Sequence, residues 1–188
     1  TGNPIYICRL PGVFGKWCKP NYNSVVATFC HNISYNLPIQ INDPSFELNL
    51  VYIDDVVEEF IQVIQGQQNN KKELSVQPEY KIQLGDLVTQ IELFREGRDS
   101  LISEKVGDGL PRKLYSTYVS YFSPKQFVYS IPSYGDERGM FAEMLKTKDS
   151  GQFSFFTAKP GVIRGGHYHH SKTEKFLVVQ GDAKFGFR

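Results

Sequence analysis

The sequence predicts an α/β region followed by an all-β region, and two observations support this fold class. Up to about residue 107, short apolar runs alternate with segments whose apolar residues recur at helical spacing, which favours a largely parallel sheet. Further along, short runs rich in β-branched and aromatic residues are separated by turn residues, with no helical period. This change predicts a domain boundary at about residue 124, between a first domain of residues 1–124 and a second of 125–188.

The first region alternates strands and helices in a regular order. Strands are expected at residues 4–10, 48–53, 74–76 and 80–84, the first of them buried and ending at Pro11 and Gly12. One helix starts near residues 21–24 and carries Val25, Val26, Phe29 and Ile33 on one face. A second helix over residues 56–64 takes Asp54 as its N-cap and ends at Gly66, and a third runs from Asp86 to Gly97.

The second region follows the Tyr-rich segment 114–122, which leads into short strands. These strands are expected at residues 127–131, 140–146 and 152–159. The region is too short to close a full barrel around a ligand. It therefore reads as an incomplete all-β domain.

Composition narrows the possible partners. A formal charge of +1 over 188 residues favours neither nucleic acid nor an anionic membrane, and no apolar run reaches spanning length. Cys8, Cys18 and Cys30 have no C-x-x-C spacing, which suits reduced thiols and a cytoplasmic protein. Because the chain begins at Thr1, just before a predicted strand, and stops at Arg188 inside an alternating pattern, we expect an internal fragment of a longer protein.

Residues 161–181 hold a constellation suited to a metal ion. His167 and His169 are two apart, so on a strand both imidazoles point to one face. Glu174 opens the apolar run 176–179, and an antiparallel return would bring its carboxylate beside the imidazoles. Three ligands with one open position describe a catalytic rather than a structural metal site. His170 falls outside this spacing and reads as a surface imidazole.

These residues match the pattern G-x5-H-x-H-x4-E-x6-G at Gly161, His167, His169, Glu174 and Gly181, and so resemble the first motif of the cupins. The resemblance implies an incomplete cupin β-barrel that holds Zn²⁺ or another divalent metal. It also implies a fourth ligand, a His of a second motif beyond Arg188. Zinc, nickel, iron and manganese all accept two imidazoles and a carboxylate.

Residues 9–15 and 51–57 resemble the C-terminal half of the extended short-chain dehydrogenase/reductases that act on nucleotide sugars, a Rossmann-like fold. The resemblance implies that Pro11, Gly12, Val13 and Phe14 lie near an NADPH nicotinamide, and that Arg9, Lys16, Asn21 and Asn23 lie near the sugar nucleotide. The plainer alternatives are that Pro11 and Gly12 only form a turn and that Asp54 only caps a helix. For Asp54 we favour the cap.

The two groups that a reductase needs for hydride transfer are missing from these residues. The pair Gly107 and Gly109 lacks a third glycine and a preceding strand, so it is interpreted as linker. Tyr121 and Lys125 have a catalytic spacing, but Pro124 interrupts the helix that would align them. The chain alone is therefore not expected to bind the dinucleotide well or to reduce a ketone.

Residues 136–143 and 162–168 resemble signature segments of the deoxysugar nucleotide 3,5-epimerases. The resemblance implies that Arg164 contacts the nucleotide diphosphate and that His167 takes a proton next to a ketone. Those epimerases work without a metal, so His167 could be ligand, base or both. Arg164 and Arg138 could instead be structural ion-pair partners of Asp136 or Glu143. We favour the phosphate contact for Arg164, because a guanidinium suits phosphate oxygens, and the structural role for Arg138.

The two halves together resemble the bifunctional capsular polysaccharide enzymes. The implied reactions are C3 epimerisation of a UDP-linked 4-keto-2-acetamido-2,6-dideoxyhexose and NADPH-dependent reduction at C4 to the talose-configured sugar, by a homodimer. Two alternatives remain: a cupin that binds a sugar without catalysis, and a non-haem iron dioxygenase. The paired reductase argues against oxygen chemistry.

Overall fold

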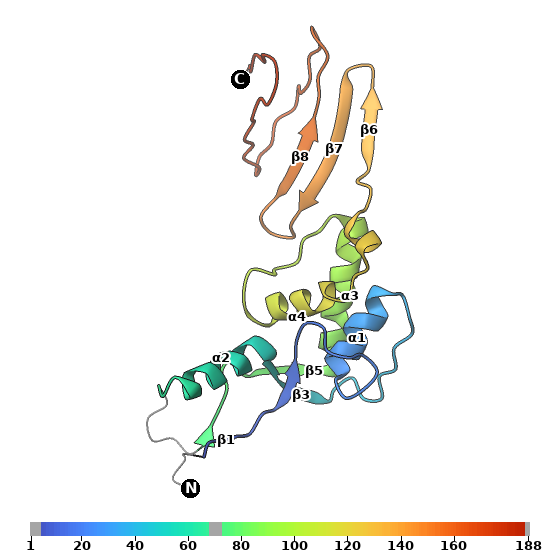
Figure 1. The fold of residues 1–188 in the computed structure, drawn as a ribbon. Helices are drawn as coiled ribbons and strands as arrows, with labels where there is room; N and C mark the ends of the chain where they lie inside the picture. Colours follow the sequence, from blue (N-terminus) through green and yellow to red (C-terminus); the bar gives the residue numbers. More distant parts are fainter. Residues whose placement is uncertain (1–4, 68–72, 187–188) are drawn as a thin grey trace.

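The computed structural model describes residues 5–67 and 73–186, with helices gathered in the N-terminal part and a separate sheet in the C-terminal part (Figure 1). The elements in chain order are β1 (Ile7–Cys8), β2 (Gly12–Phe14), α1 (Val25–Ser34), β3 (Glu47–Tyr52), α2 (Ile53–Ile64), β4 (Glu73–Leu74), β5 (Tyr80–Gln83), α3 (Leu84–Ser100), α4 (Gly109–Val119), the 3-10 helix η1 (Pro124–Phe127), β6 (Ser133–Asp136), β7 (Gly139–Lys146) and β8 (Gln152–Phe156). The predicted order of an α/β region before an all-β region is confirmed. No helix in the described ranges is long and apolar enough to cross a membrane.

The N-terminal part contains two small sheets. Strand β3 pairs parallel with β2 and antiparallel with β5, and β1 pairs parallel with β4. The expected strand at residues 4–10 is much shorter, since only Ile7–Cys8 form a ladder, and Ile7 is half exposed rather than buried. Residue 4 lies outside the described residues. The next strand, β2, starts at Gly12, where a turn was expected.

The core of this part is formed by α1, α3 and α4 against the β2–β3–β5 sheet. It includes Val26, Phe29 and Ile33 of α1, on the face expected from their spacing. The Ser24 hydroxyl accepts a hydrogen bond from the Ala27 amide and caps α1. Leu114 of α4 is fully buried in the same cluster.

Two predictions about the helices were wrong. Asp54 does not cap α2, because the helix begins one residue earlier, at Ile53, and the Asp54 carboxylate pairs with the Lys16 ammonium at 2.8 Å. The segment from Gly109 is not a linker into strands but helix α4, with Leu114, Thr117 and Tyr118 buried. Aromatic residues form a helix here because they gain tertiary packing, which outweighs their modest helix propensity.

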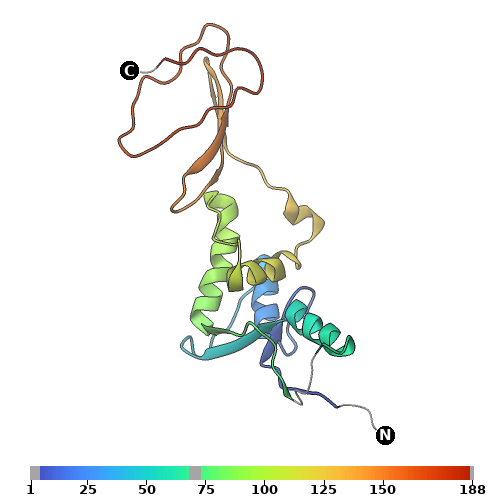
Figure 2. The ribbon, with the colours of Figure 1, turned by 90° about the vertical axis from the view of Figure 1, so that its left-hand side faces the viewer.

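The C-terminal sheet has the antiparallel order β6–β7–β8, with a register shift between Glu143 and Leu145. The strand expected at residues 127–131 is absent. Phe127 is the last residue of η1, and the next strand, β6, begins only at Ser133. Beyond β8 the chain runs beside the sheet as irregular loops (Figure 2). The predicted strand at 176–179 is absent because no described segment pairs with it, and Leu177 and Val179 are exposed.

The sheet contacts the helical part through the turn between β7 and β8. Ile102 forms a parallel bridge with Lys146, and the Ser103 amide donates to the Lys146 carbonyl at 2.9 Å. Two ion pairs flank the bridge, Lys105 with Asp149 and Lys148 with Glu104, both at 2.7 Å. The loop after α3 thus connects the two parts.

Candidate functional site

His167, His169 and Glu174 come together although none of them lies on a strand. One ligand atom from each residue lies within 4.8 Å of the others, and all three side chains are exposed. The His169 Nε2 and a Glu174 carboxylate oxygen are 3.4 Å apart, and the two imidazole rings are 4.9 Å apart. Ligands of one tetrahedral zinc ion are separated by about 3.4 Å, so small side-chain movements would bring these atoms to coordination distance.

Glycines allow the chain to bend just before this cluster. Gly165 and Gly166 have φ of 109° and 77°, values that residues with a side chain rarely adopt. The strand geometry from which the cluster was predicted is therefore wrong, but the prediction that the three side chains converge agrees with the structure. His170 is not part of the group, and its ring contacts that of Tyr168 instead.

The two arginines of the epimerase-like segments, Arg138 and Arg164, are held differently. Arg164 donates from Nη1 to the Thr157 carbonyl at 2.7 Å, and its guanidinium lies over the Phe156 ring. Arg138 donates from Nε and Nη2 to one carboxylate oxygen of Asp136, and this bonding lowers the pKa of Asp136. Arg138 therefore has the structural role expected for it, while a phosphate contact by Arg164 stays a prediction.

The residues expected near a nicotinamide lie on and before β2. Phe14 is buried and packs against Tyr52 with ring centroids 5.3 Å apart. Gly12 lies against β3, where an added Cβ would meet the Asn49 carbonyl at 3.1 Å. Strands β2 and β3 end side by side, and ligands bind at the carboxyl ends of such parallel strands. Proximity to a cofactor stays a prediction for Pro11, Gly12, Val13 and Phe14.

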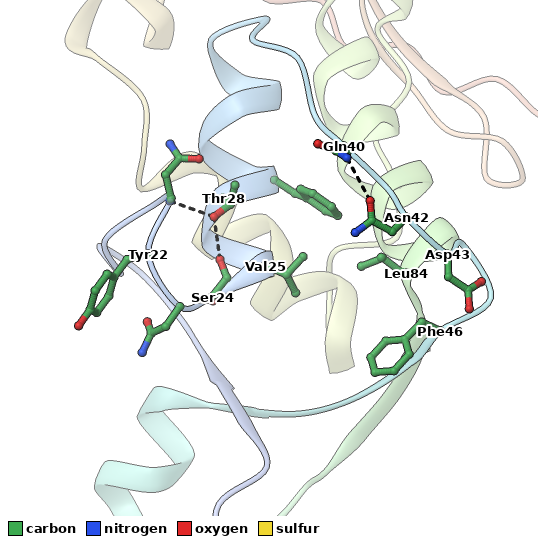
Figure 3. A pocket seen from close by; sticks show the side chains of 12 residues that line it. Tyr22, Ser24, Val25, Thr28, Gln40, Asn42, Asp43, Phe46 and Leu84 are labelled. Atoms are coloured by element: carbon green, nitrogen blue, oxygen red, sulfur yellow. Dashed lines mark hydrogen bonds between the residues drawn. The ribbon is translucent and has the colours of Figure 1, made fainter.

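Asn21 and Asn23 line an open cavity of about 640 Å³ at the N-terminus of α1 (Figure 3). The backbone N–H of Asn21 donates to the Thr28 hydroxyl at 2.9 Å, which fixes the loop to α1. Lys16 and Arg9 do not line this cavity. Lys16 pairs with Asp54, a hydrogen bond that raises the pKa of its ammonium, and Arg9 is exposed.

Sequence reasoning missed the opposite wall of this cavity. Gln40, Asn42, Asp43 and Phe46 come from the connection between α1 and β3 and line the cavity on the side opposite Tyr22 and Ser24 (Figure 3). No motif marks this connection, so only the fold could reveal it.

The Tyr121 side chain is held within the fold. Its hydroxyl donates to the Cys18 carbonyl at 2.5 Å, and burial raises its pKa. Lys125 lies beyond Pro124 in η1. The three cysteines are free thiols, and complete burial raises the pKa of Cys30.

Comparison with known proteins gives a consistent result. Residues 134–188 match the family described as "Polysaccharide biosynthesis C-terminal domain". The whole chain is 60% identical, over 187 residues, to a UDP-2-acetamido-2,6-beta-L-arabino-hexul-4-ose reductase of Pseudomonas aeruginosa, of which it covers 50%.

Solved structures similar to this chain are also of a polysaccharide assembling protein. The capsular polysaccharide assembling protein CapF from Staphylococcus aureus superposes with a TM-score of 0.84 at 43% identity, over 90% of this chain and 46% of that one. CapF with the inhibitor 3-isopropenyl-tropolone gives a TM-score of 0.85, again at 43% identity, over 90% of this chain and 49% of that one. The chain is similar to these proteins over nearly all of its own length and spans about half of theirs.

Proposed function

We propose that this chain is part of a bifunctional enzyme of capsular or surface polysaccharide biosynthesis. The substrate is a UDP-linked 4-keto-2-acetamido-2,6-dideoxyhexose. Residues 125–188, as part of a cupin barrel, epimerise C3. Residues 1–124, as the C-terminal part of a Rossmann-like reductase domain, contribute to reduction at C4 to UDP-2-acetamido-2,6-dideoxy-L-talose.

The observation that carries this proposal is the convergence of His167, His169 and Glu174 inside the segment that matches the polysaccharide biosynthesis family. Two imidazoles and a carboxylate are a donor set suited to Zn²⁺ and other divalent metals. A metal bound there would act as a Lewis acid that polarises the C4 carbonyl of the substrate. The name of the Pseudomonas relative favours this sugar chemistry over a dioxygenase or a binding protein without catalysis.

His167 is the residue we assign to proton transfer. The C3 proton is acidic because the neighbouring C4 ketone can take up charge as an enolate oxygen, and an imidazole that is not coordinated can remove such a proton near neutral pH. In this step His167 would act as the base while His169 and Glu174 would keep the ion, and a proton returned to the opposite face of C3 from solvent would invert the centre. Arg164, held at the end of β8, would bind the diphosphate through its guanidinium. Epimerisation precedes reduction, because reduction removes the ketone that makes the C3 proton acidic.

The first region supplies binding residues for the second reaction. Pro11, Gly12, Val13 and Phe14 would border the NADPH nicotinamide, while Arg9, Lys16, Asn21 and Asn23 would border the sugar nucleotide. The cavity lined by Asn21 and Asn23 supports the last assignment. We expect the chain alone to reduce nothing, since its sequence has no Gly-rich dinucleotide turn and no aligned Tyr–Lys pair.

We further propose a cytoplasmic location and a homodimer. Three free thiols suit a reducing compartment. The C-terminal sheet has β6 and β8 as its outer strands among the described elements, and unpaired strand edges favour association.

Solvent deuterium exchange tests the epimerase. The experiment uses a protein of the full length of the relatives that contains this chain. It is incubated in D₂O with the 4-keto UDP-sugar, and deuterium at C3 is followed by mass spectrometry. We expect exchange in the wild type, a loss of about 100-fold or more in His167→Ala, and no loss in His170→Ala.

Two results would contradict the proposal. Absence of C3 exchange in the metal-loaded wild type would refute the epimerase reading. Full exchange in His167→Ala would remove the role of His167. Metal content measured on each variant separates loss of the base from loss of the ion.

A further inference from the structure

A second cleft, of about 420 Å³, lies between the loop that follows β2 and the C-terminal half of α4. Lys16 and Trp17 form one side, and Ser116, Ser120 and Phe122 lie on the other. It shares no lining residue with the Asn21–Asn23 cavity. Except for Lys16, none of its residues has a role in the reactions proposed above.

Trp17 has an unusual conformation at the edge of this cleft. Its φ is 60°, a left-handed value that a bulky side chain seldom adopts, and its side chain is 78% exposed. Such strained residues concentrate at ligand sites, where the surrounding structure holds them. An indole left in water at the mouth of a cleft offers a flat apolar face to a ligand.

The C-terminal end of α4 holds this conformation in place. The Trp17 amide donates to the Ser120 hydroxyl at 3.2 Å, and the Ser120 hydroxyl donates to the Thr117 carbonyl at 2.7 Å. On the next residue, the Cys18 carbonyl accepts the Tyr121 hydroxyl at 2.5 Å. Two consecutive residues of the loop are thus bonded to two consecutive residues at the end of α4, which positions the indole beside the cleft.

The polar groups of the cleft favour an uncharged ligand rich in hydroxyls. Lys16 is paired with Asp54 at 2.8 Å, so its positive charge is largely balanced, and its ammonium lies 5.8 Å from the Trp17 ring. The Ser116 hydroxyl, 3.5 Å from the Tyr52 hydroxyl, and that of Ser120 add donors and acceptors. An apolar platform with a few polar groups suits a ring that has C–H bonds on one face and hydroxyls at its edge.

We propose that this cleft binds the pyranose ring of a sugar, which stacks on the indole of Trp17. The identity of the sugar as an N-acetylated, UDP-linked hexose rests on the proposed function. Trp17 is then the residue that recognises the pyranose ring, whereas Asn21 and Asn23, which line a separate cavity, would border the nucleotide part of the same ligand. The cleft distinguishes a nucleotide sugar from the nucleotide alone.

Because Trp17 is the single tryptophan of the chain, its fluorescence reports on this cleft alone. The wild-type chain is titrated with UDP-N-acetylglucosamine or with UDP, and quenching by acrylamide is measured with each. We expect the sugar nucleotide to shield Trp17 from acrylamide and UDP to leave it accessible.

Calorimetry on variants completes the test. Trp17→Ala should weaken UDP-N-acetylglucosamine binding about fivefold to tenfold and leave UDP binding unchanged, while Trp17→Phe keeps most of the affinity. Phe60→Ala, which removes an exposed aromatic ring of α2 outside both cavities, serves as the control and should change neither.

Equal shielding by UDP, binding without shielding, or no binding at millimolar UDP-N-acetylglucosamine would each overturn the proposal. The result is independent of the epimerase test, because UDP-N-acetylglucosamine has no 4-ketone and its binding to this cleft requires no metal. Sugar binding here could therefore hold while C3 exchange fails, or the reverse.

Discussion

Gly139 illustrates how one residue determines the turn between β6 and β7. Its φ is 144°, and a Cβ at this position would lie 2.2 Å from the Thr157 carbonyl oxygen. Both backbone strain and steric overlap therefore oppose any side chain here. We expect Gly139→Ala to lower the free energy of unfolding of the C-terminal sheet by about 2–4 kcal/mol.

Urea unfolding followed by circular dichroism would measure this change. Gly107→Ala is a matched control, because nothing lies within 4 Å of its added Cβ and its φ is not left-handed. Equal stability of the two variants would contradict the packing described around Gly139.

Single residues also show which contacts of the candidate sites can be predicted from the sequence. The spacing of His167, His169 and Glu174 was enough to predict that they converge, because few residues separate them and loop closure is local. The Lys16–Asp54 pair could not be predicted, since its partners are 38 residues apart and meet only when β2 and β3 lie side by side. The N-cap assigned to Asp54 was wrong because α2 begins before it, at Ile53, and its carboxylate pairs with Lys16 instead.

Among the elements, α4 does most to join the candidate sites to the core. Leu114 is fully buried against the α1 and α3 cluster, and Lys113 pairs with Asp55 of α2 at 2.5 Å. We expect Leu114→Ala to reduce stability by about 2–5 kcal/mol, because it leaves a cavity in a packed core. The measurement is the urea midpoint of the whole chain.

Arg112→Ala is the control on the same helix. Its side chain is exposed and makes one bond to the Gly107 carbonyl, so we expect a change of about 0.5 kcal/mol or less. A Leu114→Ala chain as stable as Arg112→Ala would show that α4 does not pack as described.

Helices and strands with local signals were predictable, and those that depend on distant partners were not. Helix α1 has its apolar face and its Ser24 cap in one continuous segment, and β3 ends in the buried apolar residues Leu50, Val51 and Tyr52. Helix α4 carries weak local signals and forms because its buried residues meet α1 and α3. Residues 176–179 show the reverse case. They have strand propensity, but no described segment pairs with them, and the strand predicted from propensity is absent.

At the scale of the whole molecule, a helical part and a sheet are joined by the loop after α3 and by the segment through η1 (Figures 1 and 2). The Trp17 cleft lies in the first part, and the His167 cluster lies beyond β8. The change from helical spacing of apolar residues to short strand-like runs was enough to predict two regions. Their contact at Ile102 and Lys146 was not predictable, because it depends on where the β7–β8 turn lies in space.

The most direct measurement is metal binding by the cluster itself. We titrate this chain with Co²⁺ and follow its absorption bands, which report coordination by imidazole and carboxylate. We expect weak but saturable binding of one ion by the three side chains present, competed by Zn²⁺, lost in His167→Ala, His169→Ala and Glu174→Ala and unchanged in His170→Ala. Binding that persists in all three ligand variants, or that His170→Ala abolishes equally, would contradict it.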